Sequence, residues 1–214
     1  MILRYYGHSQ FALELESGAV VVTDPYGSFY AYPEWKLSAQ VVTVSHHHHD
    51  HDAVDWITGN PTVIDRLGRH VPLPELTVTG IASWHDAQGG AKRGGNVVFR
   101  IEAENLSIVH LGDLGHTLTE RQCREIGAPD VLLTPVGGKY TTDAETALEN
   151  VRLLNPRITI PMHYQTQYST EMPIQPVEPF LALLHSDPQP MRLCRLTRGD
   201  LSEQPTVIRM DITV

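Results

Sequence analysis

The chain has 214 residues, of which 41% are hydrophobic and 19% charged, and its formal net charge is −9 at pH 7. This composition is typical of a soluble globular protein and excludes an intrinsically disordered chain. The acidic balance repels polyanions, so we expect no nucleic-acid partner. Because one hydrophobic core can grow to roughly 200–250 residues, we expect residues 1–214 to form a single domain.

Targeting signals and cysteine chemistry are not evident. The N-terminus, MILRYYGHSQ, lacks the apolar core of a signal peptide, and no stretch approaches the ~18 apolar residues of a membrane span. We therefore expect a cytoplasmic protein with no membrane partner. Cys123 and Cys194 are the only cysteines, and we assign them neither a disulfide nor a catalytic role. The compositional outlier is the count of twelve histidines.

The sequence of the first half of the chain predicts mainly β-strands. Short β-rich runs separated by Gly-containing turn signals predict an antiparallel meander, and an irregular aromatic segment, residues 25–35, follows it. Strands are expected at residues 2–6, 10–16, 19–24, 40–45, 62–65, 75–83, 96–102 and 105–112.

The second half alternates strands with helices. Thr119 and Gln122 form a capping box before a helix over 121–126 that Gly127 ends. Asp143 caps a helix over 144–154, which Pro156 blocks from continuing. A further helix ends at His185, and strands are expected at 130–135, 157–162 and 191–196. This order favours a two-sheet α/β layer fold.

Residues 43–54, TVSHHHHDHDAV, form the densest cluster of metal-ligand side chains. Residues at i and i+2 on an extended segment share a face, which fits the pair His46 and His48 but equally His47 and His49. The following Asp50-His51 pair decides the phase, that is, which of these two histidine pairs faces the metal. The pattern H-x-H-x-D-H, which begins at His46, supplies ligands for two neighbouring metal ions. We therefore expect His47 and His49 to make no metal contact.

Apolar strands repeatedly end in a His or an Asp. The strand-ending residues are Asp24, His46, His85, Asp113 and His163. Ligands at the ends of several strands can converge on one edge of a sheet. His110 lies inside its strand, where we expect a hydrogen-bonded core histidine.

These residues resemble the metallo-β-lactamase superfamily over residues 7 to 164. His46, His48, Asp50 and His51 match its H-x-H-x-D-H motif, and GHSQF, TDP, RGGN, HLGDLGH, PVGGKYT and PMHY resemble the small hydrolases related to L-ascorbate-6-phosphate lactonase. The resemblance implies a four-layer αββα sandwich with a two-metal site at one edge. It places His46, His48 and His85 on one ion, Asp50, His51 and His163 on the other, Asp113 between them, and Asp24 behind the ligand loop.

Imidazole and carboxylate ligands without thiolate suit Zn²⁺, Mn²⁺ or Fe²⁺. We expect the site to hold two divalent ions, with zinc preferred over manganese or iron. Two such ions would share a hydroxide and favour hydrolysis, with Asp50 orienting the hydroxide and receiving a proton. We expect the substrate to be a small anionic ester such as a phosphodiester or a lactone. The side chains expected to face it are His8, Arg93, His116, Lys139, Tyr140 and Thr141.

The alternative is a non-catalytic metal-binding or regulatory protein on the same scaffold. β-Lactam hydrolysis and transfer-RNA processing are disfavoured, because the chain shows no secretory signal and no basic appendage. An oxygen-reducing diiron role is disfavoured because His48 stands where a carboxylate would be expected. The expected partner is a small-molecule substrate, and a homo-oligomer is left open.

Overall fold

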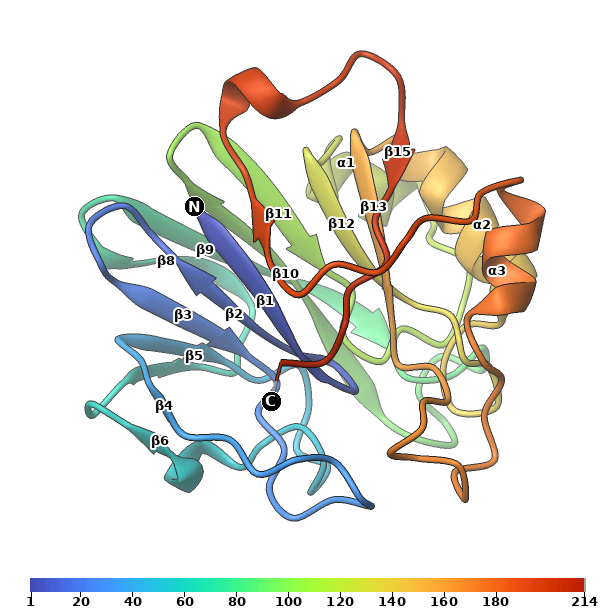
Figure 1. Ribbon diagram of the computed structural model, residues 1–214, viewed down its shortest axis with the longest axis horizontal. Coiled ribbons are helices and arrows are strands. Elements are labelled where there is room, and N and C mark those ends of the chain that lie inside the picture. Colours follow the sequence, from blue (N-terminus) through green and yellow to red (C-terminus); the bar gives the residue numbers. More distant parts are fainter. Residues whose placement is uncertain (214) are drawn as a thin grey trace.

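Two β-sheets pack face to face in the computed structural model, which describes residues 1–213 (Figure 1). The first sheet has six strands in the order β14-β1-β2-β3-β5-β7. Their bounds are β1 (Ile2–Gly7), β2 (Gln10–Glu14), β3 (Val20–Thr23), β5 (Val41–Thr43), β7 (Thr62–Ile64) and β14 (Cys194–Arg195).

The second sheet has seven strands in the order β15-β13-β12-β11-β10-β9-β8, and β4 pairs with β6 in a small separate sheet. The large sheet is antiparallel from β8 to β11 and parallel from β11 to β15. The bounds are β8 (Gly68–Leu73), β9 (Leu76–Trp84), β10 (Gly95–Ala103), β11 (Leu106–His110), β12 (Val131–Pro135), β13 (Ile158–Met162), β15 (Thr206–Val207), β4 (Leu37–Ser38) and β6 (Ile57–Thr58).

The core lies between the two sheets, where Leu3 and Tyr5 of β1 share one buried cluster with Phe99 and Ile101 of β10. The inward positions alternate along each strand because successive side chains point to opposite faces. Burial of such a side chain stabilises the fold by about 1.5–3 kcal/mol. This packing fixes the two sheets to each other.

The outer faces of the two sheets are covered differently. Helices α1 (Glu120–Ile126) and α2 (Ala144–Leu154) cover the seven-stranded sheet, and α3 (Glu178–Leu183) packs against α2 (Figure 1). Over the six-stranded sheet lie Tyr26, Tyr32 and Trp35 of the aromatic segment, near the short 3-10 helix Val54–Trp56. The layered α/β fold class is confirmed, with an aromatic layer in place of an α-helix on one side within residues 1–213.

The predicted helix signals are confirmed. Thr119 and Gln122 make both hydrogen bonds of the capping box, and Asp143 accepts a hydrogen bond from the Thr146 N–H at 2.9 Å. Helix α2 ends at Leu154 because Asn155 adopts the left-handed conformation. None of the helices within residues 1–213 is long and apolar enough to cross a lipid bilayer.

Some elements differ from the prediction. The strand expected over 191–196 is reduced to β14, because Met191 forms an isolated bridge with Met210 instead of continuing the ladder with β1. Strand β8 was not predicted, and α3 ends at Leu183, two residues before His185.

The five strands that lead into the candidate ligands end at the same edge of the sandwich. Strands β3 and β5 are parallel neighbours, and β9 runs in the direction of β11 because both are antiparallel to β10. Strand β13 follows β11 and β12 in parallel. The segments after these five strands therefore meet, and they carry Asp24, His46, His85, Asp113 and His163.

Candidate metal centre

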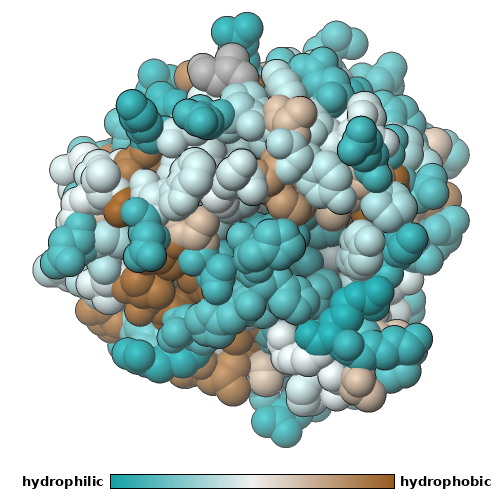
Figure 2. Space-filling model, turned by 90° about the horizontal axis from the view of Figure 1, so that it is seen from below, coloured by the Kyte–Doolittle hydropathy of each residue, from teal (hydrophilic) through white to brown (hydrophobic). Residues whose placement is uncertain are grey.

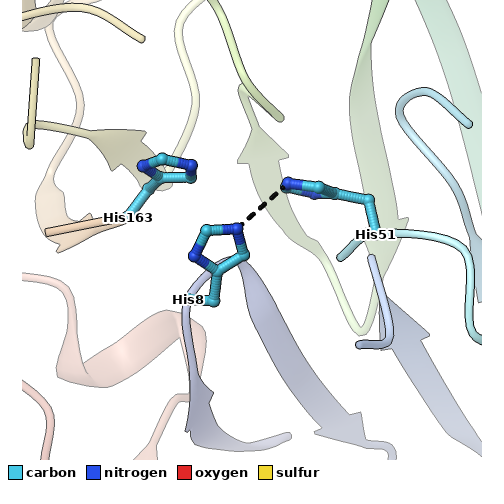
Figure 3. A group of neighbouring side chains, drawn as sticks. All are labelled: His8, His51 and His163. Atoms are coloured by element: carbon cyan, nitrogen blue, oxygen red, sulfur yellow. Dashed lines mark hydrogen bonds between the residues drawn. The ribbon is translucent and has the colours of Figure 1, made fainter. Parts of the chain in front are cut away.

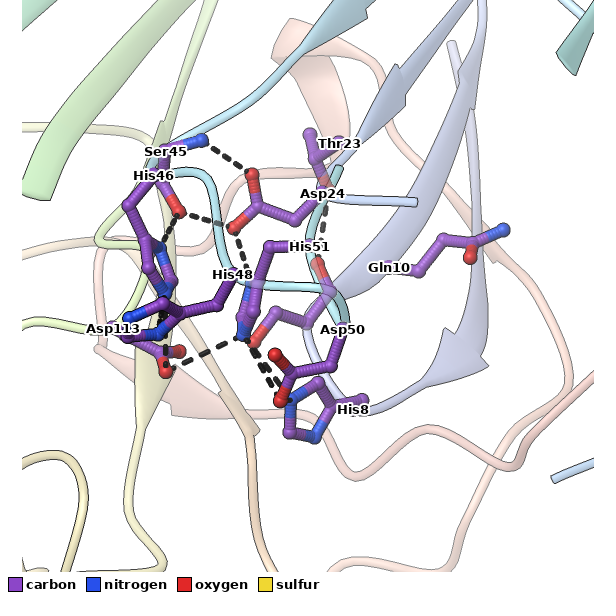
Figure 4. Close-up of polar contacts among 12 residues, drawn as sticks. His8, Gln10, Thr23, Asp24, Ser45, His46, His48, Asp50, His51 and Asp113 are labelled. Carbon is purple, nitrogen blue, oxygen red and sulfur yellow. Dashed lines mark hydrogen bonds and ion pairs between the residues drawn. The ribbon is translucent and has the colours of Figure 1, made fainter. Parts of the chain in front are cut away.

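The ligand loop after β5 is held from behind by Asp24. The Ser45 N–H donates to Asp24 Oδ1 at 2.8 Å, and the Ser45 hydroxyl donates to Oδ2 at 2.6 Å. The His51 ring donates from Nδ1 to the same Oδ2 at 3.0 Å (Figure 4). Burial alone would lower the pKa of His51, but the Asp113 and Asp24 carboxylates raise it well above its usual value, so a positive charge is favoured at this ring. In the neutral ring, with its proton on Nδ1, Nε2 keeps a free electron pair for a metal ion.

One group of side chains that could hold a metal ion consists of His46, His48 and His85, whose ring nitrogens lie within 4.8 Å of one another. His46 Nε2 is 3.0 Å from His48 Nδ1, and the other ring nitrogen of His46 is 2.9 Å from the Ser45 hydroxyl. Burial and the charge of His51 lower the pKa of His46 to about 3. The ring is therefore neutral at pH 7 and able to bind a cation.

A second group lies beside the first. Asp113 Oδ2 is 3.3 Å from Nε2 of both His51 and His163, and Asp50 Oδ2 is 3.8 Å from His51 Nε2. The same Asp113 oxygen is 3.4 Å from His85 Nε2 of the first group. Asp113 therefore stands between the two groups, as the resemblance to the metallo-β-lactamase superfamily implies.

The charges of this cluster favour a bound cation. Burial alone would raise the pKa of the Asp113 carboxyl, but the charges of His163 and His51 lower it well below its usual range. The buried atoms Asp113 Oδ1, His85 Nδ1 and His163 Nδ1 have no hydrogen-bond partner among the described residues. One buried carboxylate cannot accept hydrogen bonds from all the imidazole nitrogens that face it. Divalent ions, in contrast, can bind the electron pairs of these nitrogens and of the carboxylate together. The residues present fit a metal centre.

The loop that carries Asp113 depends on a close backbone approach. Gly112 has a φ of 56°, and a Cβ at this position would lie 2.6 Å from Ser45 Cβ and even nearer to Asn96. The Asn96 side chain accepts a hydrogen bond from the Asp113 N–H at 2.9 Å and donates to the carbonyl of Leu111 at 2.9 Å. Sequence reasoning missed Asn96, although the RGGN motif contains it.

The remaining histidines of the cluster lie outside the two groups. His47 is exposed, with ring nitrogens 3.5 Å from Asp52 and 3.6 Å from Asp65. His49 is also exposed, and its ring meets Phe29 edge-on. The structure thus separates these two rings from His46 and His48, in the phase that Asp50-His51 predicts.

His110 is the buried core histidine that the sequence predicts. Its Nε2 donates to the Ser9 carbonyl at 2.8 Å, and its Nδ1 accepts from the Gly112 N–H at 3.1 Å. Both ring nitrogens are thereby occupied.

A cavity of about 670 Å³ opens onto the metal centre, a volume typical of a site for a small molecule. The space-filling view along this edge shows hydrophilic residues in the middle of the face and hydrophobic residues beside them (Figure 2). The lining residues are Ser28, Phe29, Tyr30, His48, His49, Asp50, His85, Lys92, Arg93, Asp113, Tyr140, His163 and Met172.

Two of the six residues expected to face a substrate, Arg93 and Tyr140, line this cavity, and the Arg93 guanidinium lies 5.4 Å from the centre of the Tyr140 ring. The others are placed elsewhere. His116 bonds the Thr117 carbonyl and the Trp84 N–H and lines a neighbouring cavity.

Three more of the expected substrate contacts are absent from the described lining of the cavity. Lys139 lies beside the Tyr140 ring, with its Nζ 5.9 Å from the ring centre. Thr141 is buried, and its hydroxyl donates to the Thr142 carbonyl at 3.4 Å. His8 is fully buried behind Phe29.

Asp86 shapes the loop that brings cations to the cavity, and sequence reasoning missed it. Its Oδ1 accepts from the N–H groups of Gln88 and Gly90, and its Oδ2 from those of Lys92 and Arg93, at 2.7–3.0 Å. Burial alone would raise the pKa of Asp86, but these four donors lower it to about 2. The signal for this role was an Asp directly before a Gly-rich run, DAQGGAKRGG.

Comparison with known proteins agrees with this geometry. The family described as "Beta-lactamase superfamily domain" matches residues 2–163. A UPF0173 metal-dependent hydrolase of Staphylothermus marinus is 29% identical over 196 residues, which cover 77% of this chain and 84% of that protein. A UPF0173 metal-dependent hydrolase of Thermofilum pendens is 31% identical over 191 residues, which cover 77% and 83%.

Among solved structures, a candidate Zn-dependent hydrolase of the metallo-β-lactamase superfamily from Thermotoga maritima is 37% identical to this chain. The match covers 98% of each chain with a TM-score of 0.80. The chain therefore belongs to the metallo-β-lactamase superfamily and is a small metal-dependent hydrolase.

Proposed function

We propose that this chain hydrolyses a small anionic ester, such as a phosphodiester or a lactone, with two divalent metal ions at the ligand groups described above. The observation that carries the proposal is the position of Asp113, whose Oδ2 lies 3.3 Å from His163 Nε2 and 3.4 Å from His85 Nε2. One carboxylate oxygen thus faces both ligand groups, as expected for a group shared between two ions.

When bound, two divalent ions supply Lewis acidity and lower the pKa of a shared water towards neutrality. We propose zinc as the resident metal, because the Thermotoga maritima relative is described as a candidate Zn-dependent hydrolase. The imidazole and carboxylate ligands suit Mn²⁺ and Fe²⁺ as well, which the test below includes.

Asp50 is the proposed catalytic side chain because its carboxylate reaches the cavity. Burial alone would raise the pKa of Asp50, but the hydrogen bond from His8 and the charge of His51 lower it below its usual range. A carboxylate with a lowered pKa is a weak base. Its main contribution is therefore to orient the attacking water by accepting a hydrogen bond, and a proton that it takes from this water passes on to the departing oxygen of the leaving group.

The cavity wall supports an anionic substrate with an apolar portion. The net charge of the protein is −9, which repels anions in general, but Lys92 and Arg93 place two positive charges at the cavity and attract an anion there. Phe29 and Met172 provide apolar surface in the same cavity. Arg93 can form paired hydrogen bonds with a phosphate or carboxylate group of the substrate.

The test is a screen of phosphodiesters, lactones and thioesters with the protein loaded with Zn²⁺, Mn²⁺ or Fe²⁺. We expect turnover in the phosphodiester or lactone class, and His48→Ala should lower kcat/KM by about 10³-fold or more, since the ions contribute several kcal/mol. Circular dichroism checks that this variant folds. Silence of the fully loaded wild type across all three classes would favour a non-catalytic metal-binding protein.

A further inference from the structure

His8 occupies a strained position next to the metal centre. It lies in the turn between β1 and β2 with a φ of 54°, a left-handed conformation that is unfavourable for a residue with a Cβ. Its carbonyl accepts hydrogen bonds from the Tyr5 hydroxyl at 2.9 Å and from the His163 N–H at 2.8 Å. These two bonds hold the strained backbone and tie it to a metal-ligand residue.

The His8 ring points into the second ligand group. Figure 3 shows the rings of His8, His51 and His163 approaching one another from three separate segments of the chain. One ring nitrogen of each lies within 4.8 Å of the other two, and all three rings are buried. This burial explains why His8 does not contact the cavity, although the sequence suggested a substrate contact.

The distances around His8 Nε2 match those between ligands of one ion. Nε2 is 3.2 Å from Asp50 Oδ2 and 3.2 Å from His51 Nε2, and those two atoms are 3.8 Å apart. Three points with these separations lie on a circle with a radius of about 2.0 Å, which is the usual distance from Zn²⁺ to a nitrogen or oxygen ligand. A single ion can therefore contact all three atoms without any movement of the side chains.

A hydrogen bond alone explains this arrangement less well. In the neutral ring, which is the form that binds a metal ion, His51 donates from Nδ1 to Asp24 and its Nε2 presents an electron pair, as does the Asp50 carboxylate. One proton on His8 Nε2 would be shared between two acceptors at 3.2 Å, longer than a strong charge-assisted bond. A cation instead accepts electron pairs from all three groups at once.

We propose that His8 Nε2 is an additional ligand of the ion held by Asp50, His51 and His163. The inference rests on the metal centre of the proposed function and adds a donor to it. The two ions would then differ: one is surrounded by buried imidazoles, whereas the other depends on the exposed His48. The ion at the His8 site should bind more tightly and exchange more slowly.

The test compares wild type with His8→Gln and Tyr5→Phe. A Gln side chain can donate a hydrogen bond to Asp50 but is a poor ligand for zinc. Tyr5→Phe removes one anchor of the His8 backbone and leaves the imidazole in place. Zn²⁺ affinities are measured by chelator competition, and the Co²⁺-loaded proteins are compared by NMR, in which each bound imidazole gives a hyperfine-shifted N–H resonance.

We expect His8→Gln to weaken the tighter Zn²⁺ site by about 100-fold or more, beyond the 10–100-fold typical of residues that only orient a ligand. It should also lose one shifted N–H resonance, while Tyr5→Phe keeps the wild-type spectrum. An unchanged number of resonances in His8→Gln would overturn the assignment of His8. A wild type without any shifted imidazole resonance would instead contradict the metal centre itself.

Discussion

The carboxylate of Asp24 lies directly behind His51. Its Oδ2 is 3.0 Å from His51 Nδ1, and the opposite ring nitrogen, Nε2, is 3.3 Å from Asp113 Oδ2. The same Asp24 carboxylate holds the Ser45 N–H and hydroxyl at the start of the ligand loop. One buried side chain therefore sets both the position of this loop and the direction of a ligand ring.

Asp24→Asn should weaken Zn²⁺ binding by about 10–100-fold. The amide has only one acceptor oxygen, so if this oxygen faces Ser45, the NH₂ group faces His51 and cannot accept its hydrogen bond. Chelator competition measures the affinity. Asp52→Asn is the matched control, since Asp52 faces the exposed His47. Equal affinities for Asp24→Asn and the control would show that Asp24 does not orient His51.

The phase of the histidine run predicts an asymmetric response to alanine. His48→Ala should lose about one bound metal ion per chain, whereas His49→Ala should keep the wild-type metal content, since only His48 lies with His46 and His85. Metal analysis after dialysis gives the stoichiometry. Loss of metal in His49→Ala with retention in His48→Ala would reverse the assignment.

Substitution of Asp86 should affect substrate binding more than metal content. Asp86→Ala removes all four acceptor contacts of the loop that carries Lys92 and Arg93, so KM for an anionic substrate should rise about tenfold. Asp86→Asn keeps one acceptor oxygen and should show a smaller rise. Steady-state kinetics with a neutral and an anionic substrate distinguish a loss of charge attraction from a general loss of activity. Substitution of the exposed Asp55, Asp55→Ala, serves as the control. A KM increase of equal size for the neutral substrate would contradict a role through the cations.

Gly112→Ala should destabilise the fold by about 2 kcal/mol or more, because the added Cβ meets Ser45 and Asn96 at a residue with positive φ. Gly18→Ala is a matched control, since Gly18 also has positive φ but no heavy atom lies within 4 Å of an added Cβ. Urea unfolding of both variants measures the difference. Equal free energies of unfolding would mean that crowding at Gly112 contributes nothing.

Features with local causes could be predicted from the sequence. The capping box of Thr119 and the cap of Asp143 act within a few residues, and both appear in the structure. The phase of the histidine run was set by the adjacent Asp50-His51 pair. The edge strands β8 and β14 were predicted poorly, because short segments at sheet edges depend on pairing partners far away in the chain.

The placement of His8 and His116 was decided only by tertiary structure. His8 comes from a turn near the N-terminus, yet its ring meets residues that are 42 and 43 positions later. His116 is close in sequence to Asp113, but its hydrogen bonds to Thr117 and Trp84 hold it away from the cavity. The sequence by itself determined the types of ligand and the strands that carry them. The pairing of strands and the packing of the two sheets decided which side chains contact one another, since contacts between residues far apart in the sequence have no local signal.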